Sequence, residues 1–177
     1  MKAYAFYTNP VKDWLDLLVE SSKEFDDLEV VPILGQTNST NDLAGATHSQ
    51  DYMKLMLSRW LNLPNIIREN IGNNILFLDC DIVFNKYKKD FVSNINSFLE
   101  DHDLVTQYDT NSGMSLSINM GFLGIKCTEK TLDFFSEFMQ LISRIESPNT
   151  GYPQIEFNNH IKYLETYDTA NMPAYKV

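Results

Sequence analysis

The stretch ILFLDCDIVF, residues 75–84, is the most informative part of this 177-residue chain. Its first four residues, Ile75 to Leu78, form a continuous apolar run, as expected for a strand that helices bury on both faces. Two acidic residues, Asp79 and Asp81, follow almost at once. The sequence therefore predicts a buried central strand that ends in a pair of carboxylates.

Segments with strand and helix periodicity alternate on both sides of this stretch. We expect strands at 2–7, 29–34, 75–78, 104–108 and 118–125, and helices near 9–25, 52–63, 91–99, 128–142 and 153–164. Pro32 favours an edge position for the second strand, because proline cannot donate to a neighbouring strand. This alternation predicts an α/β fold, a mostly parallel sheet flanked by helices, in a single domain over residues 1–177 that can also be part of a longer protein.

Two helix starts are marked by capping residues. Asn9 before Pro10 is predicted to cap the first helix, along which Trp14, Leu17, Leu18 and Phe25 recur at helical spacing. Thr128 is predicted to cap the helix that ends near residue 142.

The composition excludes several functional classes. Lys and Arg number 14 against 24 Asp and Glu, so the net charge is −10, and a phosphate backbone is repelled. We therefore expect no nucleic-acid partner. No segment reaches the roughly 20 apolar residues of a membrane span, and the first residues lack a signal-peptide pattern. Cys80 and Cys127 are expected to be reduced thiols, which favours a cytoplasmic location.

The carboxylate pair points to a metal site. Asp79 and Asp81 at the mouth of a buried strand would repel each other and lose hydration, and a divalent cation removes both penalties. Mg²⁺ binds carboxylate oxygens together with substrate phosphates, so the pair predicts a metal–diphosphate site. Replacing either acid with Asn is expected to abolish metal binding and to change stability little. In the alternative interpretation, one Asp caps a turn and the other is solvated.

Three further segments occur in an order that resembles a known family. The stretch ILFLDCDIVF resembles the strand and DxD motif of GT-A-fold nucleotide-sugar glycosyltransferases. Residues 117–135, SINMGFLGIKCTEKTLDFF, resemble the family's N-x-G block, with Asn119 and Gly121 in place. Residues 153–161, PQIEFNNHI, resemble its DQxxxN helix, with Gln154 and Asn158 in place. Together with the helix that carries Lys54 and Arg59, the resemblance covers about residues 50–165.

The resemblance implies a GT-A-like fold and a metal-dependent glycosyltransferase of the hexosyltransferase type. Its donor is a nucleoside-diphosphate sugar, with a UDP-sugar favoured, its acceptor is a hydroxyl group on a glycan or another molecule, and its cofactor is Mn²⁺ or Mg²⁺. Asp79 and Asp81 would bind the metal, with His160, water or a residue outside this sequence completing the coordination.

The resemblance also implies the residues that contact the donor. Tyr7 can stack on the base or belong to the core, Thr8 and Asn9 can bond the nucleotide, and Asp51 can bind the donor or start its helix. Arg59 can pair with a phosphate or with Asp79. Asn119 can reach sugar hydroxyls, Gly121 allows close approach, and Gln154 and Asn158 can point to one ligand from one helix face.

Several questions stay open at this stage. Pro153 stands where the family has Asp, which leaves that residue's role vacant. Asp109 and Glu156 are candidate general bases, and the sequence does not choose between retention and inversion. The polar loop 35–49 is expected to close over the donor, and the alternative is a static surface loop.

Two alternative functions fit parts of the sequence. DCDIV also matches the nucleophile motif of haloacid-dehalogenase-like Mg²⁺-dependent phosphatases. A sugar-nucleotide or glycan-binding module without catalysis would explain Pro153.

Overall fold

The computed structural model describes residues 1–35, 50–108, 118–144 and 153–167. The strands are β1 (Lys2–Tyr7), β2 (Glu29–Leu34), β3 (Asn74–Asp79), β4 (Leu104–Tyr108) and β5 (Ile118–Lys126). The helices are η1 (Asn9–Val11), α1 (Lys12–Ser22), α2 (Gln50–Leu61), α3 (Leu63–Glu69), α4 (Phe91–Asp101), α5 (Glu129–Ser143) and α6 (Pro153–Tyr167).

The strands form one five-stranded sheet in the order β2-β1-β3-β5-β4. The pairs β1–β2 and β1–β3 are parallel, whereas β5 runs antiparallel to both β3 and β4. All strands except β5 therefore point the same way, which confirms the predicted mostly parallel α/β sheet. Because β5 runs in the opposite direction, its first residues lie at the end of the sheet where β1 and β3 end.

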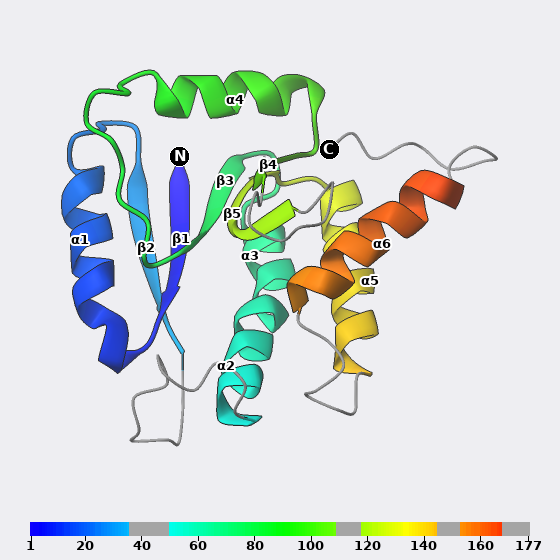
Figure 1. The fold of residues 1–177 in the computed structure, drawn as a ribbon. Coiled ribbons are helices and arrows are strands. Elements are labelled where there is room, and N and C mark those ends of the chain that lie inside the picture. Colours follow the sequence, from blue (N-terminus) through cyan, green and yellow to red (C-terminus); the bar gives the residue numbers. More distant parts are fainter. Residues whose placement is uncertain (36–49, 109–117, 145–152, 168–177) are drawn as a thin grey trace.

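Helices cover both faces of this sheet (Figure 1). Leu76 and Leu78 of β3 belong to a core that includes Leu15 and Leu18 of α1 and residues of α4. Ile75 and Phe77 belong to the other core, which α2, α3, α5 and α6 complete. All four of these β3 residues have 0% exposure, so the prediction of a central strand buried on both faces is confirmed.

Strand β2 is an edge of the described sheet, as Pro32 predicted. The backbone N–H groups of Glu29 and Gly35 donate to Met1 and Tyr7 at 2.9 and 2.8 Å. Because bonds to one neighbour recur every second residue, the Pro32 nitrogen lies on the side away from β1. Proline therefore costs no bond to β1 and leaves the outer side of β2 without a donor at that position.

The first helix differs from its prediction. A 3-10 turn, Asn9–Val11, precedes α1, and Thr8 rather than Asn9 occupies its capping position, without a side-chain cap bond. Of the apolar residues predicted at helical spacing, Leu18 and Phe25 are buried, whereas Trp14 and Leu17 are 47% and 58% exposed. Leu15 is buried in their place and packs in the same core as Leu18.

The cap of α5 matches its prediction. The Thr128 hydroxyl accepts from the Thr131 N–H at 3.1 Å, and the Thr131 hydroxyl accepts from the Thr128 N–H at 2.9 Å. None of the helices in the described part of the chain combines the length and the apolar character that crossing a membrane requires.

Candidate donor-binding and metal site

Three neighbouring strands meet at the end of the sheet that holds the carboxyl ends of β1 and β3. Strands β1 and β3 end there, at Tyr7 and Asp79, and the antiparallel β5 begins there, at Ile118. Phe6 is aligned with Asp79 and Leu78 with Phe122, so the predicted motifs of β3 and β5 are neighbours. Ligands of open α/β sheets bind at such carboxyl ends.

The N-x-G segment of β5 lies in an irregular part of the strand. The ladder with β4 jumps from the pair Thr106–Leu123 to the pair Gln107–Asn119. The residues between Asn119 and Leu123 therefore bulge out of this ladder next to Asp79. The Asn119 Oδ1 accepts from the Gly121 N–H at 2.6 Å, which fixes the bend.

Arg59 of α2 forms an ion pair with Asp79. The Arg59 side chain is 2% exposed and that of Asp79 is 43% exposed, so the pair spans the boundary between core and solvent. The guanidinium carbon lies 4.6 and 4.9 Å from the ring centres of Trp60 and Phe77. Its Nη2 donates to the Met120 carbonyl at 3.4 Å, and its Nε has no partner among the described atoms.

This pairing was one of the two interactions expected for Arg59. It also changes the expected effect of neutralising Asp79. Asp79→Asn would leave the buried guanidinium without its carboxylate, and a buried charge that loses its partner is destabilising. We therefore keep the expectation of little change in stability for Asp81 and replace it for Asp79 with an expected loss.

Gly121 packs against the Asp79 carboxylate. A Cβ atom on Gly121 would lie 3.2 Å from Asp79 Cγ and 2.8 Å from Asn119 Oδ1, with an Asp79 oxygen closer still. No side chain fits there unless the carboxylate moves. The close approach that the sequence predicted for Gly121 is thus made to Asp79.

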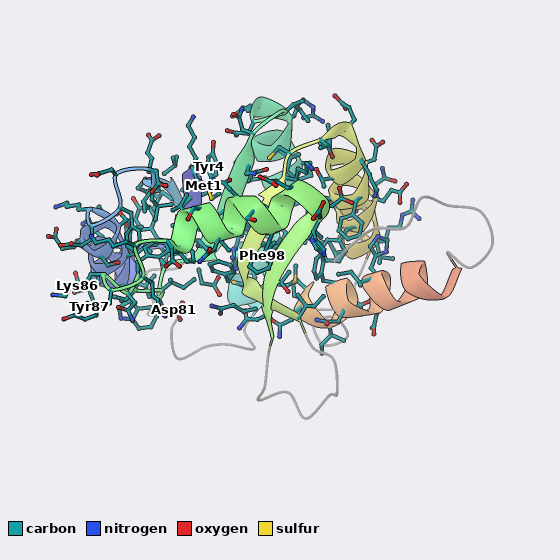
Figure 2. All side chains as sticks on the ribbon, turned by 90° about the horizontal axis from the view of Figure 1, so that it is seen from above. Met1, Tyr4, Asp81, Lys86, Tyr87 and Phe98 are labelled. Carbon is teal, nitrogen blue, oxygen red and sulfur yellow. The ribbon has the colours of Figure 1, made fainter. Side chains whose placement is uncertain are left out.

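Asp81 is exposed, on the segment that leads from β3 toward α4. Desolvation raises the pKa of its carboxyl, and the negative charge of Asp79 raises it further. Figure 2 shows Asp81 on the α1 side of the sheet. A cation between the two carboxylates would remove their repulsion.

Cys80 stands between the two acids in the sequence, but unlike Asp81 it is buried. Its side chain belongs to the α1–α4 core, and burial raises the pKa of its thiol to about 11. At neutral pH it is an uncharged core residue rather than a metal ligand.

His160 does not join Asp79 and Asp81, contrary to the expected metal set. Its ring lies 5.3 and 5.9 Å from the rings of Phe134 and Phe138, between α6 and α5. Burial lowers the pKa of His160, and its Nε2 has no hydrogen-bond partner among the described residues. Within the described ranges, no group of three His, Cys, Asp or Glu side chains is placed to hold a metal ion.

Gln154 and Asn158 do share one face of α6, as predicted, and that face contacts β5. Asn158 Oδ1 accepts from the Ile118 N–H at 2.7 Å, and its Nδ2 donates to the Ile118 carbonyl at 3.1 Å. Gln154 Oε1 accepts from the Met120 N–H at 3.2 Å. Glu156 lies two residues from Gln154, which places it on a different face of the helix.

These motifs fall within a match to a protein-family model. The model for nucleotide-diphospho-sugar transferases matches residues 28–166, which is more than half of the chain. The chain belongs to this family. It is a glycosyltransferase, and the phosphatase alternative is set aside. No curated protein matches the sequence.

Solved glycosyltransferases share the fold of this transferase. A glycosyltransferase involved in the glycosylation of the major capsid of PBCV-1 gives a TM-score of 0.59 at 15% identity, over 98% of this chain and 78% of that one. The galactosyltransferase LgtC, solved with donor and acceptor sugar analogs, gives 0.57 at 14% identity, over 91% and 70%.

GlyE from Streptococcus pneumoniae TIGR4 gives a TM-score of 0.59 at 13% identity, over 89% of this chain and 42% of GlyE. The transferase thus corresponds to less than half of GlyE. These likenesses confirm the GT-A-like fold.

The remaining predicted residues of the transferase are only partly described. Tyr7 is half-buried and packs against the α1–α4 core, Thr8 is buried and Asn9 is exposed. The Asp51 side chain, Asp109 and the polar loop from residue 36 to 49 lie outside the described residues.

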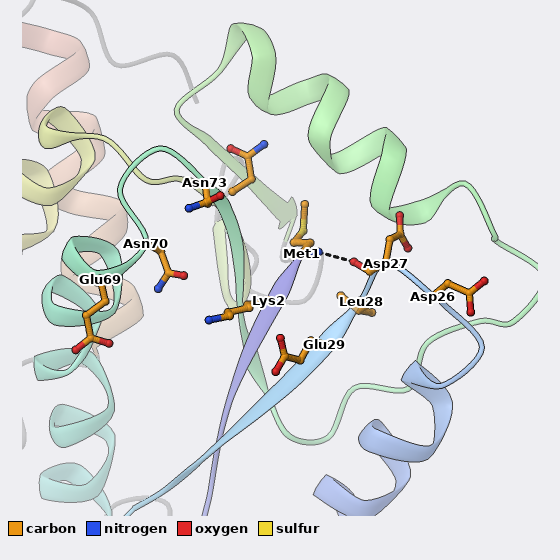
Figure 3. Close-up of a pocket in the computed structure, with 10 residues that line it drawn as sticks. Met1, Lys2, Asp26, Asp27, Leu28, Glu29, Glu69, Asn70 and Asn73 are labelled. Atoms are coloured by element: carbon orange, nitrogen blue, oxygen red, sulfur yellow. Dashed lines mark hydrogen bonds between the residues drawn. The ribbon is translucent and has the colours of Figure 1, made fainter.

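A pocket of about 530 Å³ lies at the opposite end of the sheet, where β1 begins (Figure 3). It includes Met1 and Lys2 at the start of β1, and four carboxylates from Asp26, Asp27, Glu29 and Glu69. These acids would repel a diphosphate, and the strand carboxyl ends are remote.

Proposed function

We propose that this protein transfers a sugar from a nucleoside-diphosphate sugar, with UDP-sugars favoured, to a hydroxyl group of a glycan or another acceptor, with Mn²⁺ or Mg²⁺ at Asp79 and Asp81. The observation that carries the proposal is the Asp79 carboxylate at the end of the central strand, held by Arg59 and Gly121 beside the N-x-G segment. Family membership supplies the reaction class.

The residues present fit a hard divalent cation. Asp79 and Asp81 offer oxygen ligands, and Asp79 is 43% exposed although it is paired. Two carboxylates are a normal protein contribution to a Mg²⁺ site, with water and diphosphate oxygens completing the coordination. When bound, the cation supplies positive charge that stabilises the departing diphosphate.

The chain's own residues would hold the site and the ligand. Arg59 holds Asp79 in one orientation and keeps a positive charge beneath it. Thr8 and Asn9, which follow the end of β1, offer hydrogen-bond groups for the nucleotide. Asp109 and Glu156 remain the candidates for proton transfer from the acceptor.

The location proposed for the protein is the cytoplasm. The support for it is chemical. Cys80 and Cys127 are both buried free thiols, and they lie in the two different cores, so they are not positioned to pair with each other.

Calorimetry tests the donor and the metal together. We expect heat of binding for a UDP-sugar only when Mn²⁺ or Mg²⁺ is present, and weaker or no heat for GDP-, CMP- and dTDP-sugars. Asp81→Asn should abolish this binding, while the exposed Asp133→Asn on α5 serves as a charge-matched control.

Two outcomes would contradict the proposal in different ways. No heat for any nucleotide-sugar with metal would remove the donor site altogether. Metal-dependent binding without transfer or donor hydrolysis would instead favour the binding module that Pro153 suggests.

A further inference from the structure

The first residues of β5 extend beyond the end of its neighbour β3. The β3–β5 ladder runs from Asn74–Lys126 to Leu78–Phe122, so the β5 residues that precede Phe122 have no partner on β3. On the other side, Asn119 and Ile118 pair with β4. Backbone groups of Ile118 and Met120 that face away from β4 therefore need other partners.

Helix α6 supplies most of those partners. Asn158 is 7% exposed and bonds both the N–H and the carbonyl of Ile118, as a neighbouring strand would. Gln154 accepts from the Met120 N–H, and Arg59 donates to the Met120 carbonyl. Asn158 Nδ2 also donates to the Gln154 carbonyl at 2.8 Å, which ties the side chain to its own helix.

The spacing of the two amides matches the spacing of the strand. Residues four apart on a helix are separated by about 6 Å along its axis. Residues two apart on a strand, such as Ile118 and Met120, are separated by about 6.6 Å. A Q-x-x-x-N pair on α6 can therefore bond alternate residues of an adjacent strand without distorting either element.

The next residue along β5 is the one that packs on the carboxylate. Gly121 follows Met120 directly, and its Cα leaves no room for a Cβ beside Asp79. Movement of Ile118 or Met120 would therefore change the contact between Gly121 and Asp79. A continuous chain of contacts thus joins Asn158 to the proposed metal ligand.

We propose that Asn158 is a positioning residue: it holds the start of β5 so that Gly121 keeps the Asp79 carboxylate in place for the metal. That Asn158 influences metal binding rests on the proposed function, whereas that Asn158 holds the start of β5 does not. It replaces the expectation that Asn158 contacts the donor, because its amide bonds the backbone of Ile118 and Gln154.

The test compares two variants with a neighbouring control. Asn158→Leu removes all three hydrogen bonds and keeps the number and branching of the side-chain heavy atoms, and Asn158→Asp keeps only the acceptor. Asn159→Leu, at an exposed position on the same helix, is the control. Circular dichroism and thermal melting establish that each variant is folded.

The first readout is amide hydrogen exchange in the protein without ligand. We expect the Ile118 and Met120 amides to exchange at least about tenfold faster in Asn158→Leu, to a smaller extent in Asn158→Asp, and unchanged in Asn159→Leu. Unchanged exchange in both Asn158 variants would overturn the proposal whether or not the protein binds metal.

The second readout is the affinity for Mn²⁺, measured from the electron paramagnetic resonance signal of the free ion. Loss of a supporting residue behind a metal ligand typically lowers the affinity for the metal about 10–100-fold. We expect a loss of this size for folded Asn158→Leu. Unchanged Mn²⁺ affinity with faster exchange would leave a purely structural role and refute positioning.

A loss of nucleotide-sugar affinity with unchanged Mn²⁺ affinity and exchange would show direct contact with the ligand instead. If the wild-type protein binds neither Mn²⁺ nor any nucleotide-sugar, the proposed function fails. The exchange readout then decides separately whether Asn158 holds β5.

Discussion

Gly121→Ala tests the packing between β5 and the proposed metal ligand. The added Cβ would lie 3.2 Å from Asp79 Cγ, against roughly 3.5–4.0 Å for carbon atoms in ordinary contact. The carboxylate must therefore move by several tenths of an ångström or lose its place against Arg59. Overpacking of this kind costs about 1–3 kcal/mol, and each kcal/mol lowers Tm by about 2–4 °C in a chain of this size.

Gly124→Ala is the matched control on the same strand. Its Cβ would meet Ile95 Cγ2 at 3.3 Å and Val105 Cβ at 3.4 Å, which are apolar contacts away from the carboxylates. Melting curves measure the stability of both variants, and calorimetry measures their affinity for Mn²⁺. We expect both to lose stability, but only Gly121→Ala to bind Mn²⁺ at least about tenfold more weakly. Equal Mn²⁺ affinity in the two variants would refute the reasoning.

Three other predictions follow from individual side chains. Asp79→Asn should lower the free energy of unfolding by about 1–3 kcal/mol, because Arg59 loses its partner. Asp81→Asn should change the free energy of unfolding by less than about 0.5 kcal/mol. Urea unfolding compares the two variants, and equal losses would contradict a stabilising role of the ion pair. Burial lowers the pKa of His160 below its ordinary 6.5, so the unfolded chain takes up a proton before the folded one, and stability falls as pH drops below about 6.5. In urea unfolding, His160→Phe should reduce this loss of stability between about pH 7.5 and 5.5. An unchanged loss would assign it to other groups. Burial also raises the pKa of the Cys127 thiol to about 12, so a disulfide reagent at pH 8 should modify it only after unfolding, and rapid labelling of the native protein would contradict its burial.

The position of the central strand could be predicted because burial on both faces requires a particular composition. Ile75 to Leu78 have no polar residue to place toward water, so no edge position suits them. Pro32, with its missing N–H, excludes a central position in the sheet for its strand, and Thr128 carries a side chain that fits a helix start. Each of these signals acts within a few residues of the chain.

Such local signals could not predict the direction of β5 or which face of α1 is buried. An apolar run such as 122–125 is compatible with either strand direction, and only the neighbours β3 and β4 select the antiparallel one. On α1, Leu15 and Leu18 are buried, although Trp14 and Leu17 are equally apolar, because only the packing of the helix on the sheet selects the buried face.

The fold class, the central strand and the kinds of chemical group at its end follow from the local sequence pattern. Tertiary structure decided the pairing of those groups. It placed Arg59 on Asp79, Asn158 on the backbone of Ile118, and His160 between aromatic rings instead of beside the carboxylates. Each of these partnerships joins residues far apart in the chain. The physical reason is that a polar side chain has several acceptable partners, and only the packing of the helices on the sheet brings one of them within reach.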